Sequence, residues 1–162
     1  HLRPASFTVD RIRDENEYGG VRIKSNAAVD NARVRVVIDI AFGDAIEPGV
    51  QETDLPVLLD FPAPKLRSYP RETVIAEKFQ AMVALGLANS RLKDFYDVWV
   101  LIRSYKFDDD ALARAIKATF TCRKTEIPTA LPDAFTAAFT EDAGKKDQWA
   151  AFTKQVAVDP AR

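Results

Sequence analysis

The sequence predicts an α+β fold, in which a small, mostly antiparallel sheet is followed by a helical bundle. Three observations favour this class. Apolar and polar side chains alternate in residues 1–62, apolar side chains recur at helical spacing in residues 70–157, and prolines separate these two halves. A chain of 162 residues suits one compact domain, so we expect a single domain over residues 1–162.

The β-rich half contains three alternating segments. The period-two pattern predicts strands over residues 7–12, 21–29 and 33–42. Polar residues with two glycines at 14–20, and the pair at 30–31, predict the turns between them, so successive strands should pair as hairpins. In the third strand the apolar side chains share one face, and Asp39 belongs to the other.

The segment from Ala45 to Pro70 connects the halves and contains five prolines. Proline has no backbone N–H to donate to a sheet or helix. We therefore expect at most a short edge strand here, at Val57–Phe61.

Helical spacing dominates the second half. We expect a first helix at Arg71–Leu85 that ends at Gly86, and a second that runs to about Ser104 with Asn89 or Ser90 as its cap. A third helix follows a cap among Asp108 to Asp110, and weaker patterns cover residues 132–139 and 146–156.

Composition excludes several function classes. With 23 Lys+Arg against 24 Asp+Glu, the net charge of -1 gives the whole chain no general attraction to nucleic acid. The single histidine, His1, excludes a Ser-His-Asp triad or a histidine zinc site within this chain. A single cysteine, Cys122, and no signal-like or membrane-spanning apolar stretch predict a cytoplasmic protein that does not enter a membrane.

Asp39 is the first candidate site residue, because it lies within the otherwise apolar run Val36–Ile40 of the third strand. Strand carboxylates hold the Mg²⁺ ions of phosphoryl and nucleotidyl transfer, and hard cations prefer oxygen ligands. The alternative is that Asp39 is solvated or pairs with Arg33 or Arg35.

The helical half supplies a second candidate cluster. Lys78 ends the sequence Ala-Glu-Lys on the first helix. On the second helix, Lys93 and Asp94 each lie one turn before Asp97. Lysine is a common phosphate ligand, and an aspartate can orient or deprotonate an attacking hydroxyl. The alternative is an ordinary intrahelical salt bridge with acidic residues in the first turn of the helix.

Four strings carry a family resemblance: Tyr69–Lys78 (YPRETVIAEK), Asn89–Asp97 (NSRLKDFYD), Ile38–Asp44 (IDIAFGD) and Leu58–Pro62 (LLDFP). An AEK followed by RxKDxxD at this separation resembles the AbiEii/AbiGii family of nucleotidyltransferase-like toxins. The resemblance runs from about Phe7 to Thr125.

The resemblance implies a nucleotidyltransferase fold that transfers a nucleotide from an NTP with Mg²⁺. In related toxins the acceptor is tRNA, and a cognate antitoxin holds the activity in check. Matched residue by residue, it implies catalytic roles for Asp39, Lys78 and Asp94, with Asp39 as a metal ligand and Lys78 and Lys93 at the NTP phosphates. It implies supporting roles for Glu77, Arg91 and Asp97.

The sequence departs from the family at its front. The family carries a glycine-rich strand-turn segment, and also a DxD pair that binds the catalytic metals, and nothing before Phe7 supplies either of them. Asp108–Asp110 lie in a helix-capping position and cannot replace strand carboxylates. We therefore expect the chain to be the back part of such a protein, as a fragment or a truncated gene product. Alone it should be inactive, because a metal pair is not held.

Two further expectations follow. If the chain is a nucleotidyltransferase, Asp39, Lys78 and Asp94 should converge on one cleft. The competing hypothesis is a non-catalytic binding or regulatory module, or an inactive truncated relative, in which these residues form a polar network. A sheet that lacks front strands would leave an exposed edge, which predicts a homodimer formed by strand addition or by exchanged elements.

Overall fold

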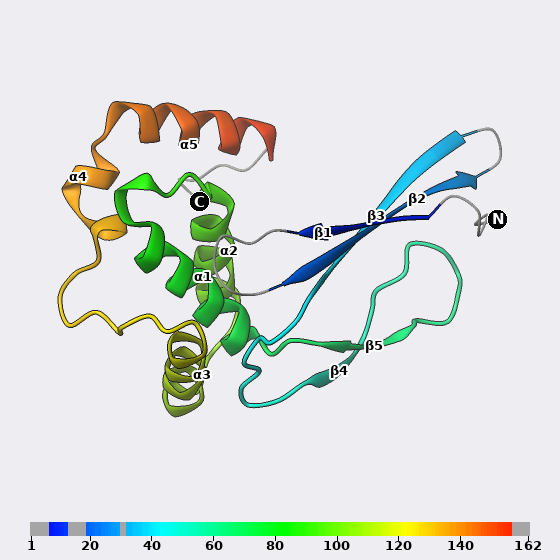
Figure 1. Cartoon of the computed structure of the whole chain (residues 1–162), viewed down its shortest axis with the longest axis horizontal. Helices are drawn as coiled ribbons and strands as arrows, with labels where there is room; N and C mark the ends of the chain where they lie inside the picture. Colours follow the sequence, from blue (N-terminus) through cyan, green and yellow to red (C-terminus); the bar gives the residue numbers. More distant parts are fainter. Residues whose placement is uncertain (1–6, 13–18, 30–31, 157–162) are drawn as a thin grey trace. The chain divides into compact units, whose positions relative to one another are not determined.

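The structure, a computed structural model, describes residues 7–12, 19–29 and 32–156. It confirms the α+β class (Figure 1). The strands are β1 (Thr8–Ile12), β2 (Gly20–Val29), β3 (Ala32–Ala41), β4 (Gln51–Asp54) and β5 (Lys65–Ser68). The helices are α1 (Arg71–Leu85), α2 (Leu92–Ser104), α3 (Asp109–Cys122), α4 (Ala137–Thr140) and α5 (Ala143–Gln155), with short 3₁₀ helices η2 (Gly86–Ala88) and η3 (Asp133–Phe135).

The chain divides into two compact units, His1–Asp44 and Ala45–Arg162. We call them unit 1 and unit 2 and describe each by itself. A single domain over residues 1–162 stays a prediction.

Unit 1 holds an antiparallel sheet with the strand order β1-β2-β3. The predicted strands are confirmed to within a residue or two. The predicted turns, at residues 14–20 and 30–31, lie mostly outside the described part of the chain, which leaves out residues 13–18 and 30–31. The register aligns Val9, Ile23 and Ile38 in one row and Asp10, Arg22 and Asp39 in the next. Since side chains alternate across a sheet, one face is mainly apolar and the other is charged.

The apolar face is predicted correctly from β3, but it is not a buried core. Ile38 is 50% exposed and Phe42, just after β3, is 58% exposed. Among the described residues of unit 1, the buried residue is Ser25 of β2.

The proline-rich connector belongs to unit 2. The predicted edge strand at Val57–Phe61 is wrong: these residues form no strand, and β4 and β5 pair with each other on either side of them. Pro56 and Pro62 bracket the segment and cannot donate ladder hydrogen bonds, and Leu58 is fully exposed.

The two strongest helix predictions are confirmed. Helix α1 begins after Pro70 and ends at Gly86, whose φ of 49° is a conformation that glycine tolerates. Neither Asn89 nor Ser90 caps α2. The Asn89 Oδ1 atom instead accepts a hydrogen bond from the Arg91 backbone N–H, one residue before the helix. Asp108 caps α3 as expected, because its carboxylate accepts from the Ala111 N–H at 2.7 Å.

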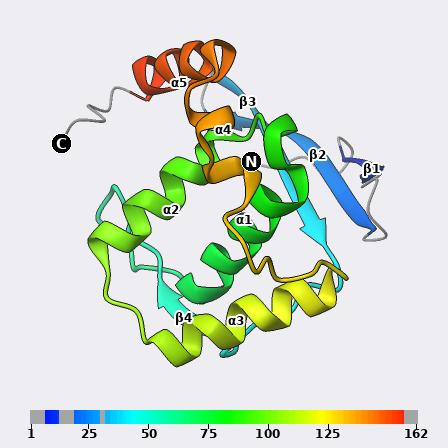
Figure 2. The same ribbon diagram turned by 90° about the vertical axis from the view of Figure 1, so that its left-hand side faces the viewer.

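The core of unit 2 forms where α1 packs against α2 and α3 (Figure 2). Met82 of α1 and Phe120 of α3 are 2% and 1% exposed. Phe79 of α1 lies with its ring centroid 5.5 Å from Phe120 and 6.3 Å from Phe135, so one aromatic cluster joins α1, α3 and η3. This packing holds α1 against α3 and η3.

The weaker helical patterns are confirmed in part. Residues 132–139 contain η3 and the start of the short helix α4 rather than one continuous helix. Helix α5 begins at Ala143, three residues before the predicted start, because the Asp142 carboxylate accepts a hydrogen bond from the Lys145 N–H and caps it. Phe152 of α5 packs edge-on against Tyr96 of α2.

Candidate functional site

The strongest charged cluster in unit 2 surrounds Lys78 of α1. Its ammonium group donates to Asp94 Oδ1 at 2.7 Å and lies 2.8 Å from Asp97 Oδ2, both on α2. Lys93 reaches the same Asp97 oxygen at 2.6 Å along α2. We call these four residues the Lys78 cluster.

Burial distinguishes the members of this cluster. The side chains of Lys78, Asp94 and Asp97 are 19%, 18% and 22% exposed, whereas Lys93 is 71% exposed. The centre of the cluster is thus partly withdrawn from water, and its exposed edge is a lysine. The four formal charges sum to zero at neutral pH.

The surroundings shift two pKa values in this cluster. Burial alone would lower the pKa of Lys78, but hydrogen bonds and charge interactions with Asp94 and Asp97 outweigh it, so the pKa is raised. Burial alone would raise the pKa of Asp97, but hydrogen bonds from Lys78 and Lys93 lower it. At neutral pH Lys78 therefore stays protonated and cannot act as a general base.

Helical spacing within α2 and the packing of α1 against α2 together form this cluster. Lys93 and Asp97 are one helical turn apart, and Asp94 follows α2's first residue, Leu92, by two positions. Leu92 is buried, and α1 packs against α2, so the start of α2 lies close to α1. A lysine of α1 then reaches across to the acidic side of α2.

Glu77 and Arg91, the other two predicted supporting residues, lie differently. Glu77 faces the end of α3, where its Oε1 lies 3.7 Å from Arg123 Nη2. Arg91 precedes α2 and is exposed. Glu77 and its neighbour Lys78 therefore form ion pairs at different places: Glu77 with Arg123, just after α3, and Lys78 with α2.

Sequence reasoning missed a polar network beside Glu77. Buried Gln80 of α1 donates to Thr125 at 2.8 Å and accepts from Arg123 at 3.0 Å. The only available signal was the basic pair at Arg123 and Lys124 after a helix, and nothing in that pattern names Gln80 as its partner.

Asp39 lies in unit 1, on the charged face of the sheet. Both its carboxylate oxygens accept from Arg22 on β2, each at 2.7 Å. Hydrogen bonding to Arg22 lowers the pKa of Asp39. The predicted alternative partners, Arg33 and Arg35, are wrong, because Arg22 is the residue directly opposite Asp39 in the register.

The structure thus brings together Lys78, Lys93, Asp94 and Asp97 within unit 2, and it places Asp39 with Arg22 in unit 1. A shared cleft for Asp39, Lys78 and Asp94 stays a prediction. Among the residues that the structure describes, no three histidine, cysteine or acidic side chains are grouped as metal ligands. The described residues alone therefore do not fit a Mg²⁺ pair.

A family model described as nucleotidyl transferase AbiEii toxin, type IV TA system, matches residues 3–162. The chain belongs to this family. The resemblance in the sequence is therefore confirmed, and the match extends past Thr125 to include the last helices. AbiEii proteins are nucleotidyltransferase toxins of toxin-antitoxin systems by that description.

No curated protein and no solved structure gives a significant match to this AbiEii chain. In the described part of the chain, no helix is both long and apolar enough to cross a membrane.

Proposed function

We propose that this AbiEii chain takes part in transfer of a nucleotide from an NTP to an RNA acceptor such as tRNA, in the cytoplasm and under the control of an antitoxin. The observation that carries the proposal is the position of Lys78, whose ammonium is held between Asp94 and Asp97. Family membership supplies the reaction class.

Lys78 has the chemistry of a phosphate ligand. An ammonium group has three donors, and in this structure two of them meet Asp94 and Asp97. The third can donate to a phosphate oxygen while the two aspartates fix the direction of the side chain. The raised pKa of Lys78 keeps its positive charge at any physiological pH. Lys93, exposed at the edge of the cluster, would add a second cation for an approaching triphosphate.

Asp94 is our candidate for the residue that accepts the proton of the attacking RNA hydroxyl or orients that hydroxyl. Its carboxylate is 18% exposed and its Oδ1 is bonded to Lys78, which leaves Oδ2 as the candidate acceptor. Asp97 then supports both lysines, Glu77 braces α1 against Arg123, and Arg91 lies where an RNA phosphate could approach.

Mg²⁺ would neutralise charge on the transferring phosphoryl group in this chemistry. Asp39 would supply one carboxylate ligand, although Arg22 already pairs with it. Because these residues do not fit a metal pair, we propose that the 162 residues alone do not catalyse transfer. Incubation with labelled NTPs, Mg²⁺ and tRNA should then leave the tRNA unlabelled, and clear labelling would overturn this metal argument.

The direct test of the Lys78 proposal is NTP binding by the 162-residue chain, measured by isothermal titration for each of the four NTPs. Lys78→Gln should weaken binding about tenfold, the loss expected for one charge-assisted hydrogen bond. Lys117→Gln, which removes an exposed lysine from α3, is the matched control and should bind as the parent does. Equal binding by Lys78→Gln and the parent chain would refute the phosphate role.

One observation favours the competing function, a non-catalytic binding or regulatory module. The charges of the Lys78 cluster already compensate each other, as they do in a structural ion-pair network. Lys78→Arg separates the two functions. It retains the charge and the ion pairs, so a structural role predicts an unchanged chain, whereas a phosphate role predicts altered NTP affinity.

A homodimer is the remaining partner that we propose. Within the described sheet β3 lies at one edge, so its outer hydrogen-bonding groups could receive a strand from a second copy. Sedimentation at micromolar concentration should show the dimer, and a monomer under those conditions would refute it.

A further inference from the structure

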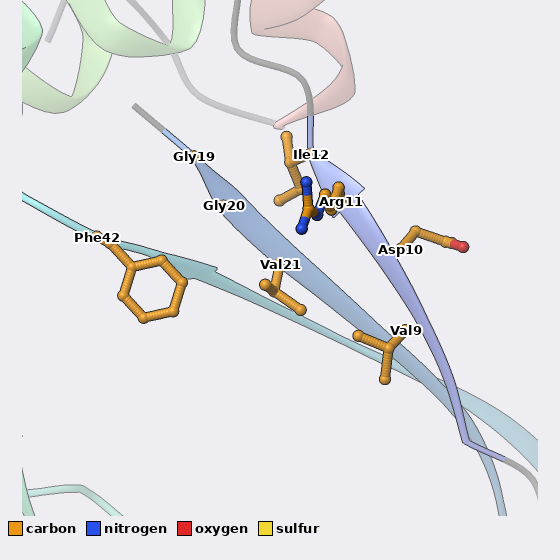
Figure 3. Close-up of a pocket in the computed structure, with 8 residues that line it drawn as sticks. All are labelled: Val9, Asp10, Arg11, Ile12, Gly19, Gly20, Val21 and Phe42. Atoms are coloured by element: carbon orange, nitrogen blue, oxygen red, sulfur yellow. The ribbon is translucent and has the colours of Figure 1, made fainter. Parts of the chain in front are cut away.

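The sheet of unit 1 carries a surface pocket of about 770 Å³ at the end where β1 finishes and β2 begins (Figure 3). Val9, Val21 and Phe42 provide apolar walls, Arg11 is the cation beside them, and Gly19 and Gly20 lie at the rim. The volume falls within the range of pockets that hold small molecules. All of the lining residues belong to unit 1, so the pocket needs no contribution from unit 2.

Arg11 is out of place on this sheet. The register puts it in a row with Val21 and Ile40, on the apolar face, whereas Asp10, Arg22 and Asp39 form the row on the charged face. On that charged face Asp39 pairs with Arg22, and Asp10 pairs with Lys24. Arg11 has neither an ion pair nor a hydrogen bond among the described residues, although its guanidinium extends over β2 beside Val21 (Figure 3).

Gly19 and Gly20 place no side chain at the edge of the pocket. A Cβ at Gly20 would lie 3.1 Å from the Ile40 carbonyl oxygen, a tight contact that a larger residue could make only if the neighbouring strand shifted by a few tenths of an ångström. A Cβ at Gly19 would meet no atom within 4 Å, which shows open space above that position. The apolar walls are correspondingly accessible: Val9 is 66% and Phe42 is 58% exposed.

We propose that this pocket binds a nucleotide, with the base against Phe42 and Val21 and a phosphate on Arg11. An exposed aromatic ring stacks on any base, because every base has a π-face. Arginine is suited to phosphate because its planar guanidinium donates two parallel hydrogen bonds. The apolar wall can hold a planar base, and Arg11 can bind the phosphate attached to it.

The proposal rests on the proposed function for its relevance, since a nucleotidyltransferase handles a free NTP and an RNA end, and both are nucleotides. It does not rest on the Lys78 cluster, which lies in unit 2. The two sites can therefore be separated by substitution.

The first test measures ATP binding to the 162-residue chain by isothermal titration, with Arg11→Gln and Phe42→Ala as the pocket variants. Each should weaken ATP binding about tenfold, the fold-change that accompanies loss of one charged or stacking contact. Arg33→Gln is the matched control, because Arg33 is an exposed arginine on the charged face of the same sheet. It should bind ATP as the parent does.

The probes separate the two parts of the ligand. Adenosine, which lacks phosphate, should bind weakly to the parent chain and show no dependence on Arg11, while inorganic triphosphate should show no dependence on Phe42. A single-stranded RNA hexamer in place of ATP tells whether the pocket prefers an RNA end or a free nucleotide. Binding of ATP or of the RNA hexamer that depends on both Arg11 and Phe42 supports the pocket, and binding of both that depends on neither residue overturns it.

The outcomes remain distinct from those of the Lys78 test. Azido-ATP photocrosslinking followed by peptide mapping should label residues near Phe42 even in Lys78→Gln, which would support the pocket whatever happens at Lys78. If the pocket variants and Arg33→Gln all bind ATP and RNA like the parent, the pocket proposal is overturned, while loss in Lys78→Gln alone would leave the proposed function intact.

Discussion

The two units differ in how far water reaches the ion pair between a carboxylate and its cation. In unit 1, Asp39 and Arg22 are 49% and 43% exposed and form one bidentate pair on an open sheet. In unit 2, Lys78 sits between two aspartates, and all three side chains are at most 22% exposed. An exposed pair is screened by water and contributes little, whereas a partly buried cluster is costly to break. The same residue types therefore make a surface contact in one unit and a fixed constellation in the other.

The largest effect is expected when the Lys78 ammonium is removed. Lys78→Met keeps the apolar stem but leaves Asp94 and Asp97 without their shared cation. We expect the free energy of unfolding to fall by about 2 kcal/mol, less than for a fully buried pair because water still reaches the cluster. Urea denaturation followed by circular dichroism measures it. A change below about 0.5 kcal/mol would mean that the cluster behaves like a surface pair.

A pH profile should give the next largest effect. The folded pKa of Asp97 lies below its ordinary value of 3.8, so its stabilisation is present above that value and is lost as the pH falls through the folded pKa. The folded pKa of Lys78 lies above 10.5, so its stabilisation is present below that value and is lost as the pH rises through the folded pKa. Between these limits the contribution of the cluster to the free energy of unfolding should not change with pH.

Asp97→Asn tests this profile directly. The variant cannot lose a charge at position 97, so the difference in unfolding free energy between it and the parent should shrink as the pH falls below about 4. Parallel stability curves for the two chains from pH 7 to pH 3 would contradict the assignment.

Local pattern predicted most of the elements that position these charges. Helices α1 and α2 follow from the helical spacing of apolar residues, and Pro70 and Gly86 mark the start and the end of α1. Strand β3 follows from the alternation of apolar and polar residues. The hairpin of β4 and β5 was missed because its strands are four residues long, and the prolines and apolar residues between them gave a misleading strand signal. Short polar strands are visible only through their pairing.

Ion pairs were predictable only where they are local in sequence. Lys93 and Asp97 follow from helix geometry, and the proximity of Lys78 to Asp94 was suggested by family motifs. The pair of Asp39 with Arg22 depends on the register between two strands, and that of Glu77 with Arg123 depends on how α1 packs on α3. The spacing of residues within one segment predicts neither the register between two strands nor the packing of two helices.

A smaller effect is expected from Lys93→Ala. Lys93 is 71% exposed, and Lys78 continues to neutralise Asp97 in its absence. We expect a loss of at most about 0.5 kcal/mol, the usual contribution of an exposed pair one helical turn apart. The urea titration used for Lys78→Met measures it. A loss as large as that of Lys78→Met would show that the two lysines act as one unit.

The smallest effect on stability is expected from Asp39→Asn. Both partners of this pair face solvent, and asparagine still offers an oxygen to Arg22, so the urea midpoint should not change measurably at neutral pH. Salt should leave parent and variant equally stable, because water already screens the exposed pair. A marked destabilisation would mean that the charged face of the sheet is covered in solution. An unchanged midpoint would make Asp39 suitable for functional tests, because any change in nucleotide or metal binding could then be assigned to its carboxylate rather than to unfolding.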